Sequence, residues 1–112
     1  MTKVEYDPEE FRMEIRGHAG TAPPGQDLVC AAASTLSFAL VNAALDRGEQ
    51  YNTHLHLNKK DAVIGVRCYP DEEHEELCRE MFRTILHGFA LLREGNPDNI
   101  EIEITGGYDG DY

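Results

Sequence analysis

The chain has 112 residues, of which 41% are hydrophobic and 28% charged, and its 21 acidic and 10 basic residues give a formal net charge of -11 at pH 7. This length suits one domain with one core, and the composition excludes wholesale disorder. The negative charge would repel phosphate backbones and anionic lipid, which argues against nucleic-acid or membrane binding and favours a basic partner.

The cysteines indicate a reducing compartment. Cys30, Cys68 and Cys78 are odd in number and follow neither a disulfide framework nor a CxxC spacing. The start of the chain has no apolar signal region, and no run approaches the roughly 20 apolar residues of a membrane span. We therefore expect a cytoplasmic protein with reduced thiols.

The chain begins with a predicted hairpin. Residues 4–6 predict a short strand, and Asp7 and Pro8 begin a turn. From Phe11 to Arg16, hydrophobic residues alternate with charged ones, which predicts a half-buried strand paired with the first. The same alternation places His18 on the polar side at the end of this strand.

A loop and a long helix follow. Residues 17–26 predict a loop, because Gly17, Gly20 and Gly25 permit positive φ and two prolines interrupt regular structure. A helix is predicted from Asp27, as its cap, to about residue 46. Its apolar residues cover much of the circumference, so we expect burial on more than one side.

The second half predicts a further hairpin, a helix and a strand. Residues 51–58 and 62–69 alternate as strands around a turn at 58–61. A helix then begins at Pro70 and Asp71 with an acidic first turn and ends at Gly95. Its apolar stripe has one-face spacing and comprises Cys78, Met81, Phe82, Ile85, Leu86, Phe89 and Leu92. Residues 100–104 alternate as a last strand.

The order β-β-α-β-β-α-β predicts an α+β fold. Its economical form is two helices packed on one face of a mostly antiparallel sheet of about five strands. We expect a single domain over residues 1–105 and a flexible C-terminal tail at 106–112.

Cys30 and His18 are the candidate catalytic pair. Cys30 would lie in the first turn after the Asp27 cap, where the helix dipole favours a thiolate and free amides can hold an oxyanion. His18 would be its base, because the intervening loop is short enough to close. The alternatives are a small buried cysteine and an exposed loop histidine.

Other polar residues have weaker signals. Ser34 would project from the same helical face as Cys30, and either supports the site or bonds a preceding helix carbonyl. His54 and His56 share a strand face and could form a metal-binding pair, but no third ligand is evident and a solvated face fits better. We therefore expect no metal and no cofactor. Cys68 and Cys78 fall on apolar faces and are interpreted as core.

The sequence also resembles a known family. The segments Gly17-His18-Ala19-Gly20 and Gly25-Gln26-Asp27-Leu28-Val29-Cys30-Ala31-Ala32, followed by Ser34, resemble the signature of Prp, the bacterial ribosomal-processing cysteine proteases. The order and length of the remaining elements also look like that family over nearly the whole chain.

The resemblance implies a cysteine endopeptidase with Cys30 as nucleophile and His18 as base. We expect supporting or substrate-binding roles for Asp27, Ser34, Gly17, Gly20 and Gly25. The resemblance also implies a homodimer whose substrate is the short N-terminal extension of large-subunit ribosomal protein twenty-seven, cut after aromatic residues. Two other functions stay open: a non-catalytic peptide-binding ribosome-assembly factor, and a metal-dependent enzyme that uses His54 and His56.

Overall fold

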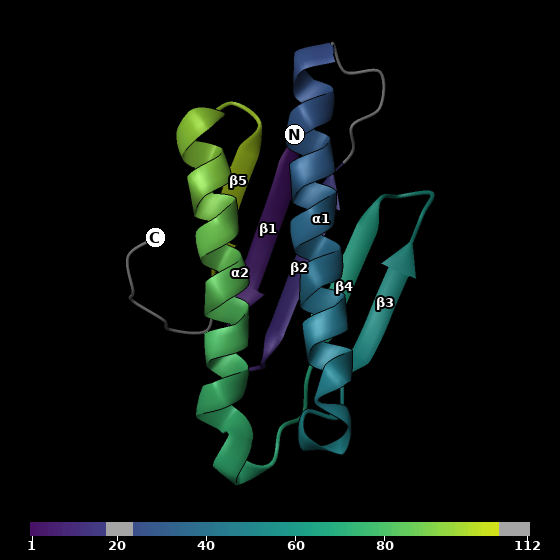
Figure 1. The fold of residues 1–112 in the computed structure, drawn as a ribbon, viewed down its shortest axis with the longest axis vertical. Helices are drawn as coiled ribbons and strands as arrows, with labels where there is room; N and C mark the ends of the chain where they lie inside the picture. Colours follow the sequence, from purple (N-terminus) through teal and green to yellow (C-terminus); the bar gives the residue numbers. More distant parts are fainter. Residues whose placement is uncertain (18–23, 106–112) are drawn as a thin grey trace.

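Two helices lie side by side on one face of a five-stranded sheet (Figure 1). The computed structural model describes residues 1–17 and 24–105, with the side chains of the first helix described from Leu28 onward. The elements are β1 (Thr2–Asp7), β2 (Arg12–Gly17), α1 (Pro24–Asp46), η1 (Gly48–Gln50), β3 (His54–Asn58), β4 (Val63–Arg67), η2 (Glu72–His74), α2 (Glu75–Gly95) and β5 (Ile100–Ile104). This confirms the predicted α+β class and element order, while the predicted tail at 106–112 lies outside the described residues.

The sheet is mixed but mostly antiparallel. Its strand order is β3-β4-β2-β1-β5. The β1–β2, β2–β4 and β3–β4 pairs are antiparallel, and β1–β5 is parallel. In the centre, Val4 stands opposite Ile15 on one side and Ile102 on the other. These three aliphatic side chains therefore share the inner face that packs against the helices.

The core fills the space between the sheet and the helices. Met13 and Ile15 of β2 are buried, as the alternation predicts, and the ring of Tyr6 packs 5.6 Å from that of Phe82 on α2. The predicted stripe of α2 is also confirmed, because all seven of its members belong to this core or pack against it. α2 is therefore an amphipathic helix held by one apolar face.

The start of α1 differs from the prediction. The helix begins at Pro24, not at Asp27, so Asp27 lies inside it and is not its cap. The physical reason is that proline has no N–H and a fixed φ near -65°, which suits the first helical position. The second proline therefore starts the helix, although the sequence pattern predicted that both prolines interrupt regular structure.

β3 also differs from the half-buried strand that was predicted. It begins at His54, because a 3₁₀ turn and Asn52, whose φ is 44°, occupy the residues before it. β3 is an edge strand, and both of its leucines are exposed. Its alternation is real, but no helix packs closely enough on its apolar side to bury the two leucines.

α1 is apolar enough to raise the question of a membrane. Residues 28–46 are long and apolar enough to cross one, with a mean hydropathy of 1.9, and 33% of this stretch is buried. The expectation that no run approaches the length of a membrane span is therefore wrong, because α1 has both the length and the apolar composition. One such helix is weak evidence for a membrane, because core helices pass the same test, and buried Leu40, Val41 and Ala44 anchor α1 in the core.

At Gly17 the end of β2 lies very close to the start of β1. It pairs with Thr2, donates its N–H to the Ala62 carbonyl at 3.1 Å, and has a φ of 139°. A Cβ at this position would lie 2.3 Å from the Met1 carbonyl oxygen and 2.6 Å from the Thr2 Cα. Only glycine fits both the conformation and the space.

We therefore expect Gly17→Ala to lower the free energy of unfolding by about 3 kcal/mol, since it combines backbone strain with a backbone clash. Gly48→Ala is the matched control. Gly48 also has positive φ, at 54°, but a Cβ added there would have nothing within 4 Å. It should cost about 1 kcal/mol. Urea unfolding monitored by circular dichroism compares the two, and equal costs would contradict the close-approach argument.

Candidate active site

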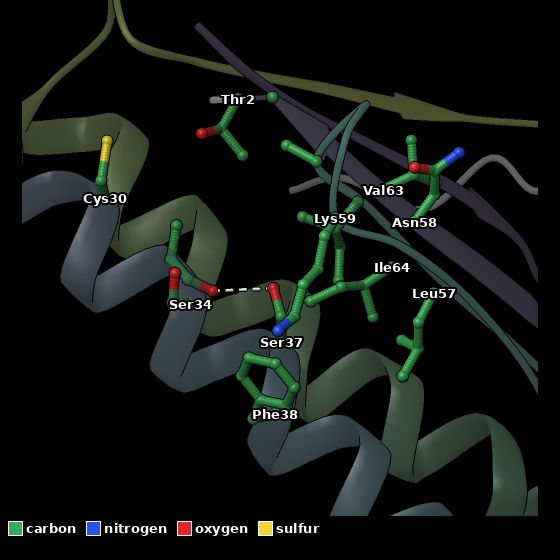
Figure 2. Close-up of a pocket in the computed structure, with 14 residues that line it drawn as sticks. Thr2, Cys30, Ser34, Ser37, Phe38, Leu57, Asn58, Lys59, Val63 and Ile64 are labelled. Atoms are coloured by element: carbon green, nitrogen blue, oxygen red, sulfur yellow. Dashed lines mark hydrogen bonds between the residues drawn. The ribbon is translucent and has the colours of Figure 1, made fainter. Parts of the chain in front are cut away.

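A mostly apolar cavity of about 450 Å³ lies between α1 and the β3–β4 hairpin (Figure 2). From α1 it is lined by Cys30, Ala33, Ser34, Ser37 and Phe38. From the strands and the hairpin turn it is lined by Thr2, Ile15, Gly17, Leu57, Asn58, Lys59, Ala62, Val63 and Ile64. The uncovered side of β3 therefore becomes one wall of a site whose opposite wall is α1.

Cys30 and Ser34 line this cavity from successive turns of α1. The Cys30 thiol is free and partly exposed, and lies at one end of the site (Figure 2). The prediction that Ser34 shares its helical face is confirmed. Ser34 makes no hydrogen bond to another described residue, whereas the Ser37 hydroxyl donates to the Ala33 carbonyl at 2.8 Å. The exposed Ser34 thus lines the cavity without a hydrogen-bond partner among the described residues.

The local environment of Cys30 differs from the prediction. Because α1 begins at Pro24, Cys30 belongs to its second turn. Only the first four N–H groups of an α-helix lack an internal partner, and the dipole effect falls off within the first turn. The free amides therefore precede Cys30 by one turn. The Cys30 side chain leans toward them, because helical side chains point toward the N-terminus. The case for Cys30 rests more on its partly exposed position in a cavity than on the dipole.

Gly17 places the end of β2 beside the same cavity. It is the last described residue before His18, so the chain leaves the described region at the wall of the site. His18, Gly20 and the side chain of Asp27 lie outside that region, and Gly25 is described only as part of the α1 backbone. The pairing of His18 with Cys30 stays a prediction.

The other two thiols belong to the core, as predicted. Cys68 and Cys78 are buried, and Thr53 Oγ1 lies 3.4 Å from Cys68 Sγ. The hydrogen bond between the two thiols lowers the pKa of Cys68 and raises the pKa of Cys78, whose burial raises it further. Neither lines the cavity that Cys30 borders.

The strand histidines lie away from Cys30. His54 and His56 are exposed on β3, and the His54 ring meets Tyr69 edge-on at 5.2 Å. His54 and His56 line a different hollow from the cavity that Cys30 borders. Among the described residues, no third metal ligand joins this pair. The metal-dependent alternative therefore gains no support there.

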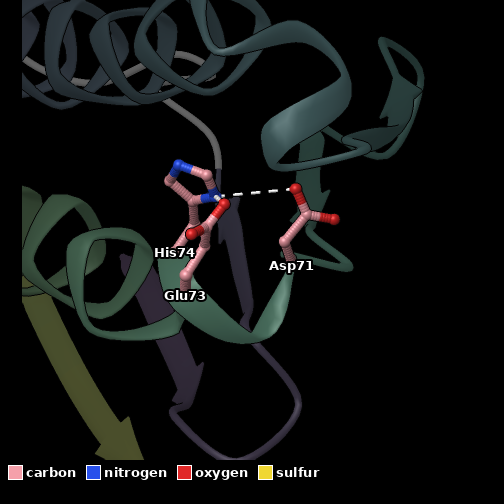
Figure 3. A group of neighbouring side chains, drawn as sticks. All are labelled: Asp71, Glu73 and His74. Atoms are coloured by element: carbon pink, nitrogen blue, oxygen red, sulfur yellow. Dashed lines mark ion pairs between the residues drawn. The ribbon is translucent and has the colours of Figure 1, made fainter.

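Among the described residues, a cluster of possible metal ligands lies at η2, just before α2 (Figure 3). Asp71, Glu73 and His74 have ligand atoms within 4.8 Å of one another. The His74 Nδ1 atom lies 3.5 Å from Asp71 Oδ2 and 3.9 Å from Glu73 Oε1. Both acids are exposed and precede a helix whose dipole favours negative charge. The preference for acidic residues at a helix start explains the cluster without a metal.

Sequence reasoning missed the far wall of the cavity. Phe38, Leu57 and Lys59 line it together although they come from a helix, a strand and a turn. Periodicity predicted each element but not which turn faces which helix. The apolar residues all round α1 predicted burial on more than one side, but they did not identify which residues lie opposite the helix.

Comparison with known proteins gives a family and a fold. Residues 1–101 match the family model described as cysteine protease Prp. No curated protein matches the chain. The match spans both segments that carry the resemblance and most of the described fold.

Similar solved structures share the whole architecture. A ribosomal processing protease Prp from Staphylococcus aureus, in complex with a substrate peptide, has a TM-score of 0.78 at 19% identity and covers 94% of this chain and 100% of that chain. The same protease with a covalently linked product peptide gives 0.76 at 21% identity, with the same coverage. SMU.848 from Streptococcus mutans gives 0.72 at 29% identity, covering 94% and 92%.

The burial of the thiols predicts their reactivity. With the folded protein near neutral pH, we expect iodoacetamide to modify Cys30 and to spare Cys68 and Cys78, because the latter two are shielded from reagent. In denaturant all three should react. Peptide mass spectrometry identifies the sites, and Cys30→Ser should remove the fast-reacting thiol alone. Equal labelling of Cys68 or Cys78 in the folded protein would contradict the burial argument.

Proposed function

Because the chain belongs to the Prp family of cysteine proteases, we propose that it is an endopeptidase in which Cys30 is the nucleophile and His18 the general base. One observation supports this most directly. The thiol of Cys30 borders an apolar cavity that Gly17 also lines, and Gly17 immediately precedes His18 in the sequence. The cavity gives room for a peptide side chain beside the thiol.

The proposed reaction follows from these groups. His18 takes the proton from the Cys30 thiol as sulfur attacks the scissile carbonyl carbon, and then gives that proton to the leaving amine. Water hydrolyses the resulting thioester and regenerates the thiol. We assign the oxyanion to first-turn amides of α1, residues 25–27, because these N–H groups lack helical partners and precede Cys30 by one turn. Ser34 is a candidate for orienting the substrate.

We further propose a ribosomal substrate. The Staphylococcus aureus protein of the same fold is a ribosomal processing protease that binds a substrate peptide. The N-terminal extension of large-subunit ribosomal protein twenty-seven, cut after aromatic residues, would place an apolar side chain in the cavity. The net charge of -11 favours encounter with a basic ribosomal protein and disfavours direct nucleic-acid binding. We place the reaction in the cytoplasm, where thiols stay reduced.

Membership of a protease family argues against a peptide-binding assembly factor without activity. The two functions differ in a measurable way, because a binding module would not need a reactive thiol.

We also propose that the protein is a homodimer. Between Leu28 and Leu45, α1 carries no charged residue, yet Leu28, Phe38 and Leu45 are 75%, 51% and 51% exposed. Such a surface favours a protein partner over water. A second copy of the chain would supply one.

Cleavage of an extension peptide with paired aromatic residues tests the catalytic assignment. We expect Cys30→Ala to reduce kcat/KM at least about 1,000-fold, and His18→Ala about 100-fold or more, because the first removes the nucleophile and the second its base. His18→Ala should also slow iodoacetamide labelling of Cys30. Chromatography with mass spectrometry measures products.

His56→Ala is the matched control, since this exposed histidine lies away from the cavity, and it should retain full activity. Cleavage that survives Cys30→Ala would refute the nucleophile. Loss of activity with His56→Ala but not with His18→Ala would refute the base.

The dimer has its own test in sedimentation velocity. We expect the wild-type chain to sediment as a dimer and Leu45→Glu to shift it toward monomer, because a buried unpaired carboxylate is costly. Leu91→Glu on α2, where the native leucine is 70% exposed, is the control and should leave the dimer intact. A monomeric wild-type chain would contradict the homodimer.

A further inference from the structure

The cavity beside Cys30 contains one feature that its apolar walls do not explain, which is the ammonium group of Lys59. We propose that Lys59 is a specificity-determining residue that selects a peptide carrying a carboxylate side chain near the apolar residue held in the cavity. The proposal rests on the peptidase function proposed above and adds a charge preference to it.

Lys59 stands out chemically among the residues that line the cavity. Of the described lining residues it alone carries a formal charge, and most of the others are aliphatic, aromatic or alanine. Its side chain extends from the hairpin turn across the cavity toward α1 (Figure 2). No described carboxylate forms an ion pair with it.

The turn fixes where this lysine starts. The side-chain amide of Asn58 donates to Asp61 Oδ2 at 2.9 Å, and the Asp61 N–H donates to Asn58 Oδ1 at 3.1 Å. The Ala62 N–H also donates to the Lys59 carbonyl at 3.3 Å. These bonds hold the backbone in one shape and engage the carboxylate of the turn with Asn58. Asp61, the nearest acid in the sequence, therefore bonds Asn58 and forms no ion pair with Lys59.

A bound peptide changes the environment of the ammonium. When apolar groups fill the cavity they displace water, and electrostatic interactions strengthen as the local dielectric constant falls. An ammonium that loses water without gaining an acceptor is penalised, whereas a carboxylate supplies a charge-assisted hydrogen bond. A lysine or arginine at the same peptide position would add repulsion. The site should thus prefer acidic over neutral over basic side chains at that position.

The overall charge of the chain does not cancel this preference. Its net charge of -11 repels an acidic peptide at long range, but exposed charges are screened beyond about 8 Å at physiological ionic strength. Lys59 acts at contact distance, inside that limit. The preference should therefore appear at one peptide position and not as a general attraction for acidic peptides.

The experiment is a charge scan with a charge reversal. A cleavable parent peptide is substituted with Glu, Gln or Lys at one position at a time on both sides of the scissile bond, and kcat/KM is measured at constant ionic strength. For the wild-type enzyme we expect one position at which kcat/KM is about fivefold higher for the Glu peptide than for the Gln peptide, and about fivefold higher for the Gln peptide than for the Lys peptide. Lys59→Glu should invert this order at the same position.

Lys60→Glu is the matched control. Lys60 is exposed on the same turn but does not line the cavity, so this variant makes the same change in net charge and should keep the wild-type order. The proposal is overturned if the Glu/Lys ratio is the same in wild type and Lys59→Glu at every position, or if Lys60→Glu inverts the order equally.

Binding separates this proposal from the peptidase function. The same labelled peptides are titrated into Cys30→Ala, with and without Lys59→Glu, and followed by fluorescence anisotropy. If the wild-type enzyme cleaves none of them, the peptidase function fails, while the affinity ratio of the Glu and Lys peptides still decides the role of Lys59. Cleavage without any charge preference would refute Lys59 and leave the peptidase intact.

Discussion

α2 packs against β5 and α1 packs against β4, so the two helices span four of the five strands. Neighbouring strands are about 4.8 Å apart and packed helices about 10 Å apart, so a helix pair matches the width of four strands and leaves the fifth uncovered. The uncovered strand is β3. Its exposed Leu57, together with the adjacent face of α1, forms part of the apolar walls of the cavity. The candidate site is thus a consequence of the sheet being one strand wider than its helical cover.

Features of the fold that depend on local periodicity were predictable from the sequence. Met13 and Ile15 alternate with charged residues and are buried, and the stripe from Cys78 to Leu92 packs against the sheet. In both cases the spacing of two residues in a strand, or three or four in a helix, places the apolar side chains on the same inward face. The prediction of a buried face depends on several residues at once, so it stays correct when the predicted ends of the strand or helix are slightly wrong.

Features that depend on contacts between distant segments were not predictable. Nothing in residues 2–6 or 100–104 specifies that β1 and β5 pair in parallel, because that pairing follows from the path of α2 across the sheet. The cavity wall formed by Phe38, Leu57 and Lys59 likewise depends on how segments that are distant in the sequence pack together. The role of Pro24 is a different case. Its local rule was available, but the same residue type both ends and starts helices, and only the three-dimensional path distinguishes the two.

The electrostatics of the chain work on two length scales, and the site combines them. At a distance the excess of acidic residues gives a negative field, which favours encounter with positively charged molecules. Within the cavity the described walls carry no acid and one lysine, so contact selection there follows apolar fit and a single positive charge. A substrate protein that is basic overall, but whose cleaved segment is apolar with an acidic side chain, would satisfy both. Steering by the whole surface and recognition by the cavity then use opposite charges without conflict, because screening separates their ranges.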